Sequence, residues 1–344
     1  MAPQTFDVRI ATHSNARCSS GCGNVDRMLK VVAALLVALA TVTACTGAPA
    51  VQVAPQPCSP AVAIAGFSDA LDGATYGARR IYPLTGLSGL AVDRDGSLLA
   101  LSDRSVLFTL DPRSRGPRGA IPLADGAGEA LDAEALAVDA DGTRLVASEA
   151  PPAILRFDTD GRLVGRLDVP PDLAARAAGN DALEGVAVLA PDRIVAAMEG
   201  PLAGDDPGVR RFPTWTGGAP GPTFSYRPDP GLDVAELAAT GDGRLLVVER
   251  SFTPGVGNTV HLALADPRGD TLARTPLADL GACPDLGAPT QQAQANPLLD
   301  NVEGMTLLGP TPDGALRVLL VSDDNQSAEQ TTRLYDLEVR LPPA

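Results

Sequence analysis

The chain has very few lysine, histidine and aromatic residues. Lys30 is the only lysine, there are 2 histidines, and Phe, Trp and Tyr together make up 3% of the sequence. From Cys45 onward, 23 arginines stand against 40 aspartates and glutamates. Binding to nucleic acid is disfavoured, because neutralising phosphates requires a positively charged surface. We therefore expect no nucleic-acid partner.

Several common catalytic motifs are also absent from the sequence. It contains no Gly-x-Ser-x-Gly nucleophile elbow, no Walker loop, no dinucleotide-binding fingerprint and no zinc motif. A serine hydrolase would have to use His261, the only histidine after Cys45, and no serine motif lies near it. Any chemistry is therefore expected from the abundant acidic side chains.

Residues 27–45 have the features of a lipoprotein signal peptide. Arg27 and Lys30 precede an apolar run that ends in Val42-Thr43-Ala44-Cys45. The run has about a dozen residues, whereas a helix needs roughly 20 to cross a bilayer, so a transmembrane anchor is the less favoured alternative. We expect Cys45 to be the first mature residue, lipidated and held on the outer face of the cell membrane.

This interpretation divides the chain into four parts. Residues 1–27 are polar and would displace the positive region from the N-terminus, so we interpret them as a non-native extension. Residues 28–44 are the signal peptide. Residues 45–57 are the lipidated cysteine and an uncharged, Ala/Pro/Val/Gln-rich flexible tether. Residues 58–344 are long enough for one all-β domain.

Two of the five cysteines remain for a disulfide. Cys18 and Cys22 precede Met28, and Cys45 carries the lipid, which leaves Cys58 and Cys283 in an oxidising location. An even pair of cysteines outside the cytosol predicts a bridge. Two isolated cysteines are too few for a metal cluster.

Five segments share one pattern: an apolar run, a turn that usually contains Asp-Gly or Pro-Asp, a second apolar run, and an acidic residue. The runs are too short for helices, and the turns are typical of β-hairpins. The second hairpin is followed by another over residues 153–169, which gives the four strands of one propeller blade. The repeats begin at Ser88, Glu134, Glu184, Glu236 and Glu303, close to the roughly 40 to 50 residue spacing of blade repeats.

We therefore predict an all-β fold, a single β-propeller of four-stranded blades. Five repeats are visible, and a sixth, degenerate blade would draw on residues 58–86 or 280–300. The last repeat ends after three strands, the third within residues 333–341, while residues 62–71 form an unassigned strand near the start. We expect these terminal strands to close the ring, because closure hides sheet edges that would otherwise pair with other chains.

The acid that opens each inner strand and the acid that closes the next strand are expected at one rim near the propeller axis, because a hairpin returns to the end at which it started. So many carboxylates cannot stay ionised together without cations or arginines, and clustered oxygen ligands suit calcium. The alternative is that they cap strands or pair with Arg104 and Arg250. The candidate metal ligands are Asp103, Glu134, Glu184, Glu236, Glu303, Asp323 and Asp324, and the candidate catalytic acids are Glu149, Glu199 and Glu249.

These motifs resemble a known family. The openings Glu184-Gly185-Val186 and Glu303-Gly304-Met305, together with Ser102-Asp103-Arg104, Val248-Glu249-Arg250 and Val321-Ser322-Asp323-Asp324-Asn325, resemble the phytase-like propellers called "esterase-like activity of phytase". The resemblance implies calcium-dependent hydrolysis of phosphoesters or carboxylic esters, with calcium bridging acids and substrate and activating water. The near absence of Lys and Tyr departs from such phosphate sites and argues against phytate as substrate.

We therefore expect a monomeric calcium-dependent hydrolase of a small anionic substrate or ester. Glu184, Glu303 and Asp323 are the leading calcium ligands, and Arg104 and Arg250 would orient an anionic substrate group. Two alternatives stay open. One is a non-catalytic envelope propeller that binds a ligand or partner, with any calcium structural. The other is a lactonase-type hydrolase with one axial metal.

The start of translation gives the first prediction. If Met28 is the true initiator, no peptide from residues 1–27 should be found in cells that express the native gene. Peptide mass spectrometry of whole-cell protein, with peptides from 58–344 as the positive control, checks this. A peptide from within residues 1–27 would show that translation starts upstream.

Overall fold

Short apolar runs joined by tight turns form nearly all of the regular structure. In the computed structural model, residues 50–177 and 182–344 are described. The proposed extension 1–27, the signal peptide 28–44 and Cys45 lie outside the described residues. Within the described part of the chain, no helix is long and apolar enough to cross a membrane.

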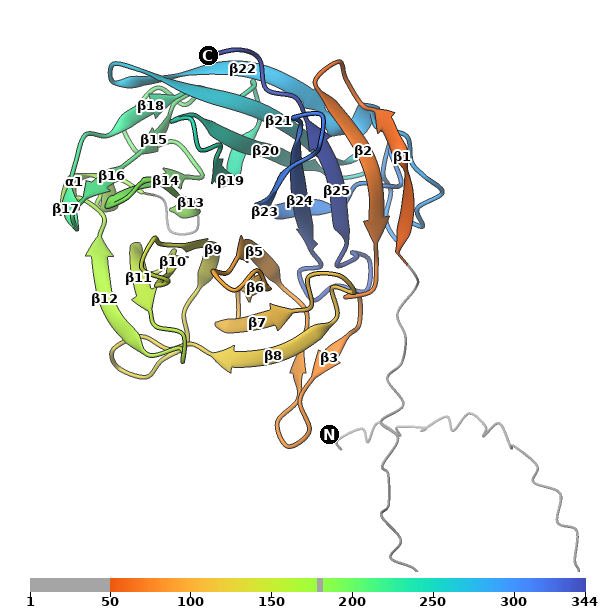
Figure 1. The fold of residues 1–344 in the computed structure, drawn as a ribbon. Coiled ribbons are helices and arrows are strands. Elements are labelled where there is room, and N and C mark those ends of the chain that lie inside the picture. The colour runs from red at the N-terminus through yellow and green to blue at the C-terminus, as the bar shows by residue number, and fades with distance from the viewer. Residues whose placement is uncertain (1–49, 178–181) are drawn as a thin grey trace, which may run out of the picture. The chain divides into compact units, whose positions relative to one another are not determined.

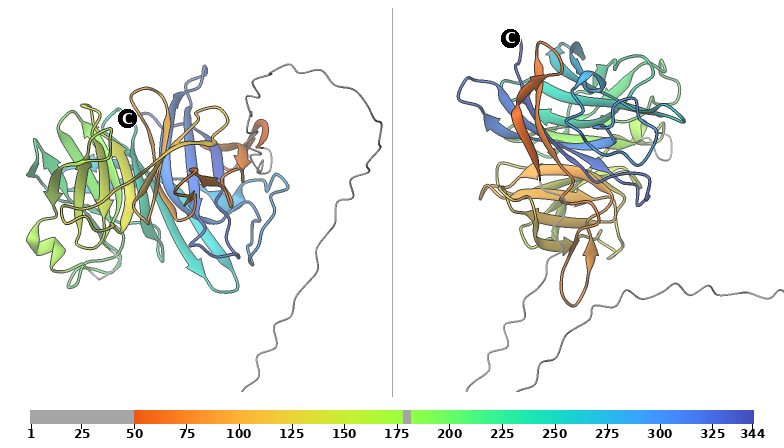
Figure 2. Two further views of the ribbon diagram at one scale, coloured as in Figure 1. Left: turned by 90° about the horizontal axis from the view of Figure 1, so that it is seen from below. Right: turned by 90° about the vertical axis from the view of Figure 1, so that its right-hand side faces the viewer.

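The strands form five blades arranged around a central axis, as the face view and the two side views show (Figures 1 and 2). Each blade is a sheet of at least four strands, and in blades one to three the strand nearest the axis comes first in the chain. Blade one has β5 (Leu87–Val92), β6 (Leu98–Ser102), β7 (Val106–Leu110) and β8 (Pro117–Pro122), and blade two has β9 (Ala133–Val138), β10 (Arg144–Ser148), β11 (Ala153–Phe157) and β12 (Leu163–Asp168).

Blades three and four are less regular than the first two. Blade three has β13 (Leu183–Ala190), β14 (Arg193–Met198), β16 (Thr214–Thr216) and β17 (Ala219–Pro220). Blade four has β19 (Asp233–Ala239), β20 (Leu245–Thr253), β21 (Gly257–Arg268) and β22 (Thr271–Asp279), extended by β18 (Phe224–Tyr226) and β15 (Arg210–Phe212). The remaining small elements are the hairpin of β3 (Thr75–Tyr76) and β4 (Tyr82–Pro83), helix α1 (Pro171–Ala174) and a 3-10 turn at Leu280–Ala282.

The two ends of the described chain meet in blade five. Its strands are β23 (Asn301–Pro310), β24 (Leu316–Asp323), β25 (Leu334–Val339), β2 (Val62–Ser68) and β1 (Val51–Pro57). Strand β2 pairs antiparallel with β25, so the N-terminal part of the domain supplies the fourth strand after the C-terminal part has supplied three. The predicted ring closure is confirmed. Because 62–68 belongs to blade five and 280–300 forms only the 3-10 turn and loops, the described residues contain five blades and no sixth.

Part of the predicted tether is a strand. We expected residues 45–57 to remain unpacked, but Val51–Pro57 forms β1 on the outer edge of blade five, paired with β2. Val51 packs against the core of that blade. The uncharged alternation Val51-Gln52-Val53 suits a strand with one half-buried face, and the prolines are tolerated because β1 is an edge strand.

Small residues let the inner strands approach one another around the axis. A Cβ atom added to Gly185 would lie 2.8 Å from Leu237 Cγ in the neighbouring blade, and one added to Gly304 would lie 3.1 Å from the backbone oxygen of Ser88. The inner strands therefore pack almost backbone to backbone. Beside them a cavity of about 220 Å³ is lined by apolar residues of all five inner strands, including Leu90, Leu136 and Met305.

The predicted disulfide is present. Cys58 and Cys283 are bonded, across a separation of 225 residues in the sequence. Cys58 directly follows β1, and Cys283 follows the 3-10 turn after blade four. The bridge therefore ties the N-terminal strands of blade five to the connection that enters the same blade.

Reduction of this bridge should destabilise the domain. A loop of this length corresponds to a loop-closure contribution on the order of 5 kcal/mol, although measured values often fall below that figure. We expect a reducing agent to lower the melting temperature, the Cys58→Ser variant to melt at the same lower temperature, and reductant to have no further effect on that variant. Thermal melts followed by circular dichroism check this. Two titratable thiols in the native, unreduced domain would contradict the bridge.

Candidate functional site

A register irregularity recurs at the start of the inner strands. In blades one, two, three and five, one extra residue on the inner strand lies between two successive pairs with the second strand, which is a β-bulge. The extra residues are Ser88, Glu134, Glu184 and Glu303. The second strands place a further acid just beyond the last of these pairs, at Asp103, Glu149, Glu199 and Asp323.

In blade four the bulge lies one residue before the acid that opens the repeat, whereas in blades two, three and five it lies at that acid. Val234 pairs with Glu249 and Glu236 pairs with Val248, so the extra residue is Ala235 rather than Glu236. The residue beyond the last pair is accordingly Arg250 rather than Glu249. Because side chains alternate between the faces of a strand, a shift of one residue changes where each of them points.

The prediction that Glu236 and Glu249 belong to the acidic rim is therefore wrong. Glu236 is fully buried and accepts hydrogen bonds from the backbone N–H groups of Leu237 (2.8 Å) and Val186 (3.3 Å). Burial raises the pKa of Glu236 well above its ordinary value. Glu249 is also fully buried and accepts two hydrogen bonds of 2.7 Å from the Arg274 guanidinium. Both acids stabilise contacts of blade four.

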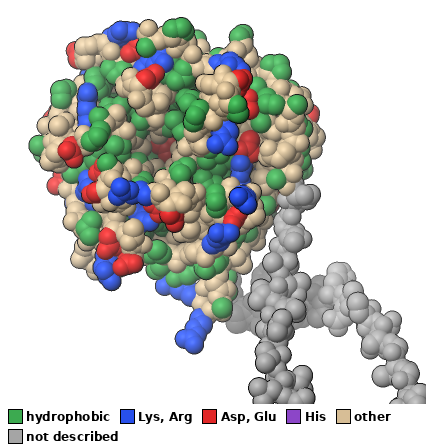
Figure 3. All heavy atoms as spheres, in the orientation of Figure 1, with side chains coloured by type: hydrophobic (Ala, Val, Ile, Leu, Met, Phe, Trp, Pro, Cys, Tyr) green, Lys and Arg blue, Asp and Glu red, His purple; other side chains and the backbone are tan. Residues whose placement is uncertain are grey.

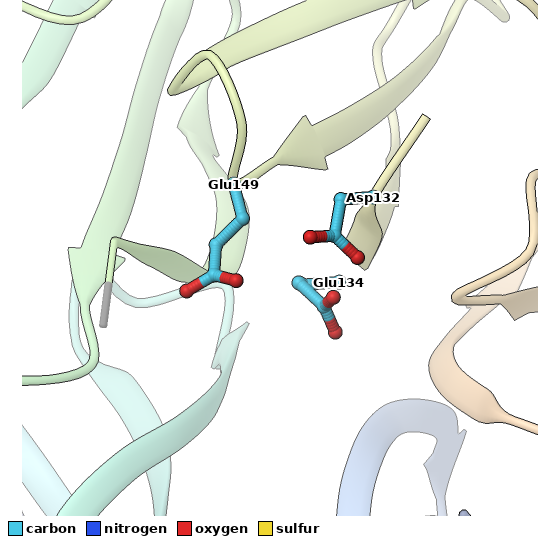
Figure 4. Close-up of side chains that lie close together, drawn as sticks. All are labelled: Asp132, Glu134 and Glu149. Atoms are coloured by element: carbon cyan, nitrogen blue, oxygen red, sulfur yellow. The ribbon is translucent and has the colours of Figure 1, made fainter. Parts of the chain in front are cut away.

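The other acids do come together near the axis. Carboxylate oxygens of Asp132, Glu134 and Glu149 lie within 4.8 Å of one another, and so do those of Glu149, Glu184 and Glu199. Figure 4 shows the first three carboxylates turned toward a common space. We use the name axial ring for the carboxylates that interact here, which are Asp103, Asp132, Glu134, Glu149, Glu184, Glu199, Glu303 and Asp323.

Burial and mutual repulsion hold protons on several of these groups. Burial, together with the nearby charges of Glu303 and Asp132, raises the pKa of Glu134 to about 9. Burial and Glu303 raise the pKa of Asp323 to about 8. The pKa of Glu184 is raised for the same reasons, with Glu199 as the strongest neighbouring charge. A cation placed among these oxygens would offset the repulsion that adds to the effect of burial on these pKa values.

Arg250 supplies positive charge on one side of the axial ring. Its Nη2 donates to Glu303 Oε1 at 2.8 Å and lies 3.9 Å from Glu199 Oε1. Burial alone would lower the pKa of Arg250, but the carboxylates of Glu303, Glu184 and Glu199 raise it overall. Asn301 Nδ2 donates to the same Glu303 oxygen at 2.8 Å. The shifted register of blade four thus brings a cation to a position where the other blades carry acids.

Asp324 and Arg104 lie away from the ring. Asp324 accepts hydrogen bonds from the Thr85 hydroxyl (2.5 Å) and the Gly86 backbone N–H (3.0 Å), which joins blade five to the entry of blade one. Arg104 is exposed and lines a separate cavity of about 610 Å³ together with Asp324. The structure therefore gives neither residue the central position that we predicted.

His261 also lies away from the axial ring. Its Nδ1 is 2.8 Å from Asp229 Oδ2, and the residue is part of β21, the third strand of blade four.

A second feature adjoins the ring between blades four and five. A cavity of about 360 Å³, which we call the side pocket, is lined by Arg250 and Glu303 of the ring region together with mostly uncharged polar residues. Figure 3 shows that arginine and acidic side chains are interspersed over one face of the domain, with a hollow near its centre.

Comparison with known families agrees with the motifs. The sequence profile of the Phytase-like family, described as "Esterase-like activity of phytase", matches residues 82–326, which is most of the chain. The chain belongs to this family. No curated protein matches this phytase-like sequence.

Several solved structures of low sequence identity also match the chain. The *Myxococcus xanthus* glutaminyl cyclase matches with a TM-score of 0.45 and 14% identity, over 75% of this chain and 92% of that one. The PQQ-bound aldose sugar dehydrogenase of *Streptomyces coelicolor* matches with a TM-score of 0.42 and 14% identity, over 83% and 100%. The virginiamycin B lyase of *Staphylococcus aureus* matches with a TM-score of 0.41 and 10% identity, over 83% and 80%.

Two members of the site were not among our sequence candidates. Asp132 precedes the first acid of its repeat by two residues, so an alternating strand pattern would have placed both on one side. Asn301 stands in the same relation to Glu303. In both repeats the signal is a polar side chain two residues before the acid that opens the repeat.

The stability of the metal-free phytase-like domain should depend on pH. The pKa of Glu134 rises from 4.5 to about 9 and that of Asp323 from 3.8 to about 8, so between these limits the folded state binds more protons than the unfolded chain. Stability is therefore greatest near the acidic end of this interval and falls as pH rises through it. Thermal melts in chelator from pH 5 to pH 9 check this, and Glu134→Gln should reduce the slope. Stability that rises steadily over this range would contradict the assignment.

Proposed function

We propose that this phytase-like protein is a calcium-dependent hydrolase of phosphoesters or simple esters, with its active site at the axial ring. The observation that carries the proposal is the convergence of eight carboxylates from four blades, several of them buried, in a member of the phytase-like family. Clustered carboxylate oxygens are the ligands that calcium prefers. We further propose that lipidation of Cys45 holds the enzyme on the outer face of the cell membrane.

The donor set fits calcium better than a softer metal, because all members of the two tight groups are carboxylates. Asp132, Glu134 and Glu149 would hold one ion, and Glu149, Glu184 and Glu199 offer a second group that shares Glu149. When bound, calcium would polarise the ester or phosphoryl oxygen and lower the pKa of water.

The remaining side chains have roles that depend on their own charges. Arg250 carries a positive charge beside the ring and would attract a phosphate or carboxylate group of the substrate. Asp323 lies outside the two tight carboxylate groups and has its pKa raised to about 8. Burial, the largest cause of this shift, remains when calcium is bound, so in its protonated form Asp323 would donate a proton to the oxygen of the leaving alcohol.

Hydrolysis assays with and without calcium test the proposal. The mature chain carrying Cys45→Ser should hydrolyse p-nitrophenyl phosphate or p-nitrophenyl acetate in calcium, lose this activity in chelator and regain it when calcium is restored. Glu184→Gln should reduce kcat/KM by about 100-fold or more, because it removes an anionic ligand. Glu129→Gln is the matched control, since Glu129 is exposed in the connection between β8 and β9. Absence of turnover on both substrates at every calcium level would contradict the proposal.

A further inference from the structure

The side pocket differs in chemistry from the axial ring beside it. Where the ring is made of carboxylates, the pocket wall consists mainly of amide and hydroxyl side chains. These come from strands of blades four and five, from the loop that enters blade five and from the connection between its strands β24 and β25, and they are Asn258, Gln292, Asn301, Asn325, Ser327 and Gln330. Such groups both donate and accept hydrogen bonds without carrying charge.

Asn258 is the residue that points most strongly to a ligand. Its side chain is more than nine-tenths buried, and among the described residues neither Oδ1 nor Nδ2 has a hydrogen-bond partner. Its backbone N–H is satisfied by Gln294 Oε1 at 2.8 Å, so the backbone is fixed while the amide is left unpaired. Buried amides without partners are costly and rare in folded proteins. Both ends of this buried amide lack a protein partner on a residue that lines the side pocket, which suits a ligand that can donate and accept side by side.

An exposed aromatic ring adjoins this amide. Phe252 lines the side pocket and has half of its surface exposed. It pairs directly with Asn258 in the β20–β21 ladder, so the two side chains belong to neighbouring positions of one hairpin. An exposed aromatic ring next to polar groups offers an apolar contact and hydrogen bonds at the same place. Sugar and cyclitol rings have this combination, because their C–H faces are apolar and their edges carry hydroxyl groups.

The charges of the pocket argue against a highly phosphorylated ligand. Its one arginine, Arg250, is already paired with Glu303 at 2.8 Å, and Glu329 adds a further negative charge to the lining. Phosphate oxygens only accept hydrogen bonds, so they would leave Asn258 Oδ1 without a partner. Hydroxyl groups satisfy both ends of the amide.

We infer that the side pocket binds an uncharged polyhydroxylated ring, a sugar or cyclitol, stacked on Phe252 and hydrogen-bonded by Asn258. The inference deepens the proposed function and rests on it for one point only: the bound ring would be the non-reacting part of the ester substrate, placed next to the axial ring. Binding of the ring itself does not depend on hydrolysis.

Saturation-transfer-difference NMR on the mature chain carrying Cys45→Ser tests the inference directly. The probes are methyl glucoside, methyl mannoside, N-acetylglucosamine and myo-inositol, with inositol hexakisphosphate as the charged comparison. We expect saturation transfer to the ring C–H protons of at least one neutral probe. Phe252→Ala and Asn258→Leu should each weaken its binding about fivefold to tenfold, whereas Phe252→Tyr should retain it.

Val256→Ala is the matched control, because Val256 is exposed on the same hairpin and does not line the side pocket. Melting temperatures show whether each variant is folded. No transfer to any neutral probe, or binding that Phe252→Ala leaves unchanged in a folded variant, would overturn the inference. Preferred binding of inositol hexakisphosphate at the same residues would also overturn it.

The outcomes separate the pocket from the proposed activity. Neutral-sugar binding that depends on Phe252 and Asn258, without turnover of any ester, would support ring binding at the side pocket and contradict the proposed hydrolase function. Calcium-dependent turnover of p-nitrophenyl esters without binding of any neutral probe would support the hydrolase function and contradict ring binding at the side pocket.

Discussion

Repulsion among buried carboxylates at the propeller axis is the constraint on which the site depends. Eight acids from four blades converge here, several of them buried, and both burial and the neighbouring carboxylates raise the pKa values of Glu134, Glu184 and Asp323. Three responses are open to the protein: protonation, an internal cation, or a bound metal ion. Arg250 is such an internal cation, but it lies on one side of the ring only. The charges of the remaining carboxylates must therefore be neutralised by bound protons or by a metal ion.

The fold holds these carboxylates close together despite their mutual repulsion. Small residues on the inner strands bring five backbones together, and the terminal strands and the Cys58–Cys283 bridge close blade five. The acids sit on bulges and strand ends, where side chains can turn toward the axis without disturbing the apolar ladders between them. The domain is therefore rigid where its charges repel one another, as a preorganised site requires.

Much of this architecture could be predicted from the sequence, because hairpin turns and apolar runs repeat with a fixed plan. The blades and the closure of the ring could be predicted from the local sequence pattern. The disulfide could be predicted from the number of cysteines that remain after Cys45. The error in blade four has a definite physical origin: the bulge falls on a different residue without changing the sequence pattern. In blade four that residue is Ala235, so Glu236 and Glu249 turn into the blade and Arg250 turns to the axis. Only the strand register reveals this, and the unpaired amide of Asn258 likewise becomes visible only in three dimensions.

The central claim is that the axial ring binds a divalent cation, and calcium binding to the purified mature chain tests it most directly. After removal of metal with chelator, isothermal titration should show stoichiometric calcium binding accompanied by proton release, because the ring holds protons in the absence of metal. A variant carrying Glu134→Gln and Glu184→Gln should lose this binding while staying folded. A folded, metal-free wild-type chain that takes up no calcium across the neutral pH range would contradict the account.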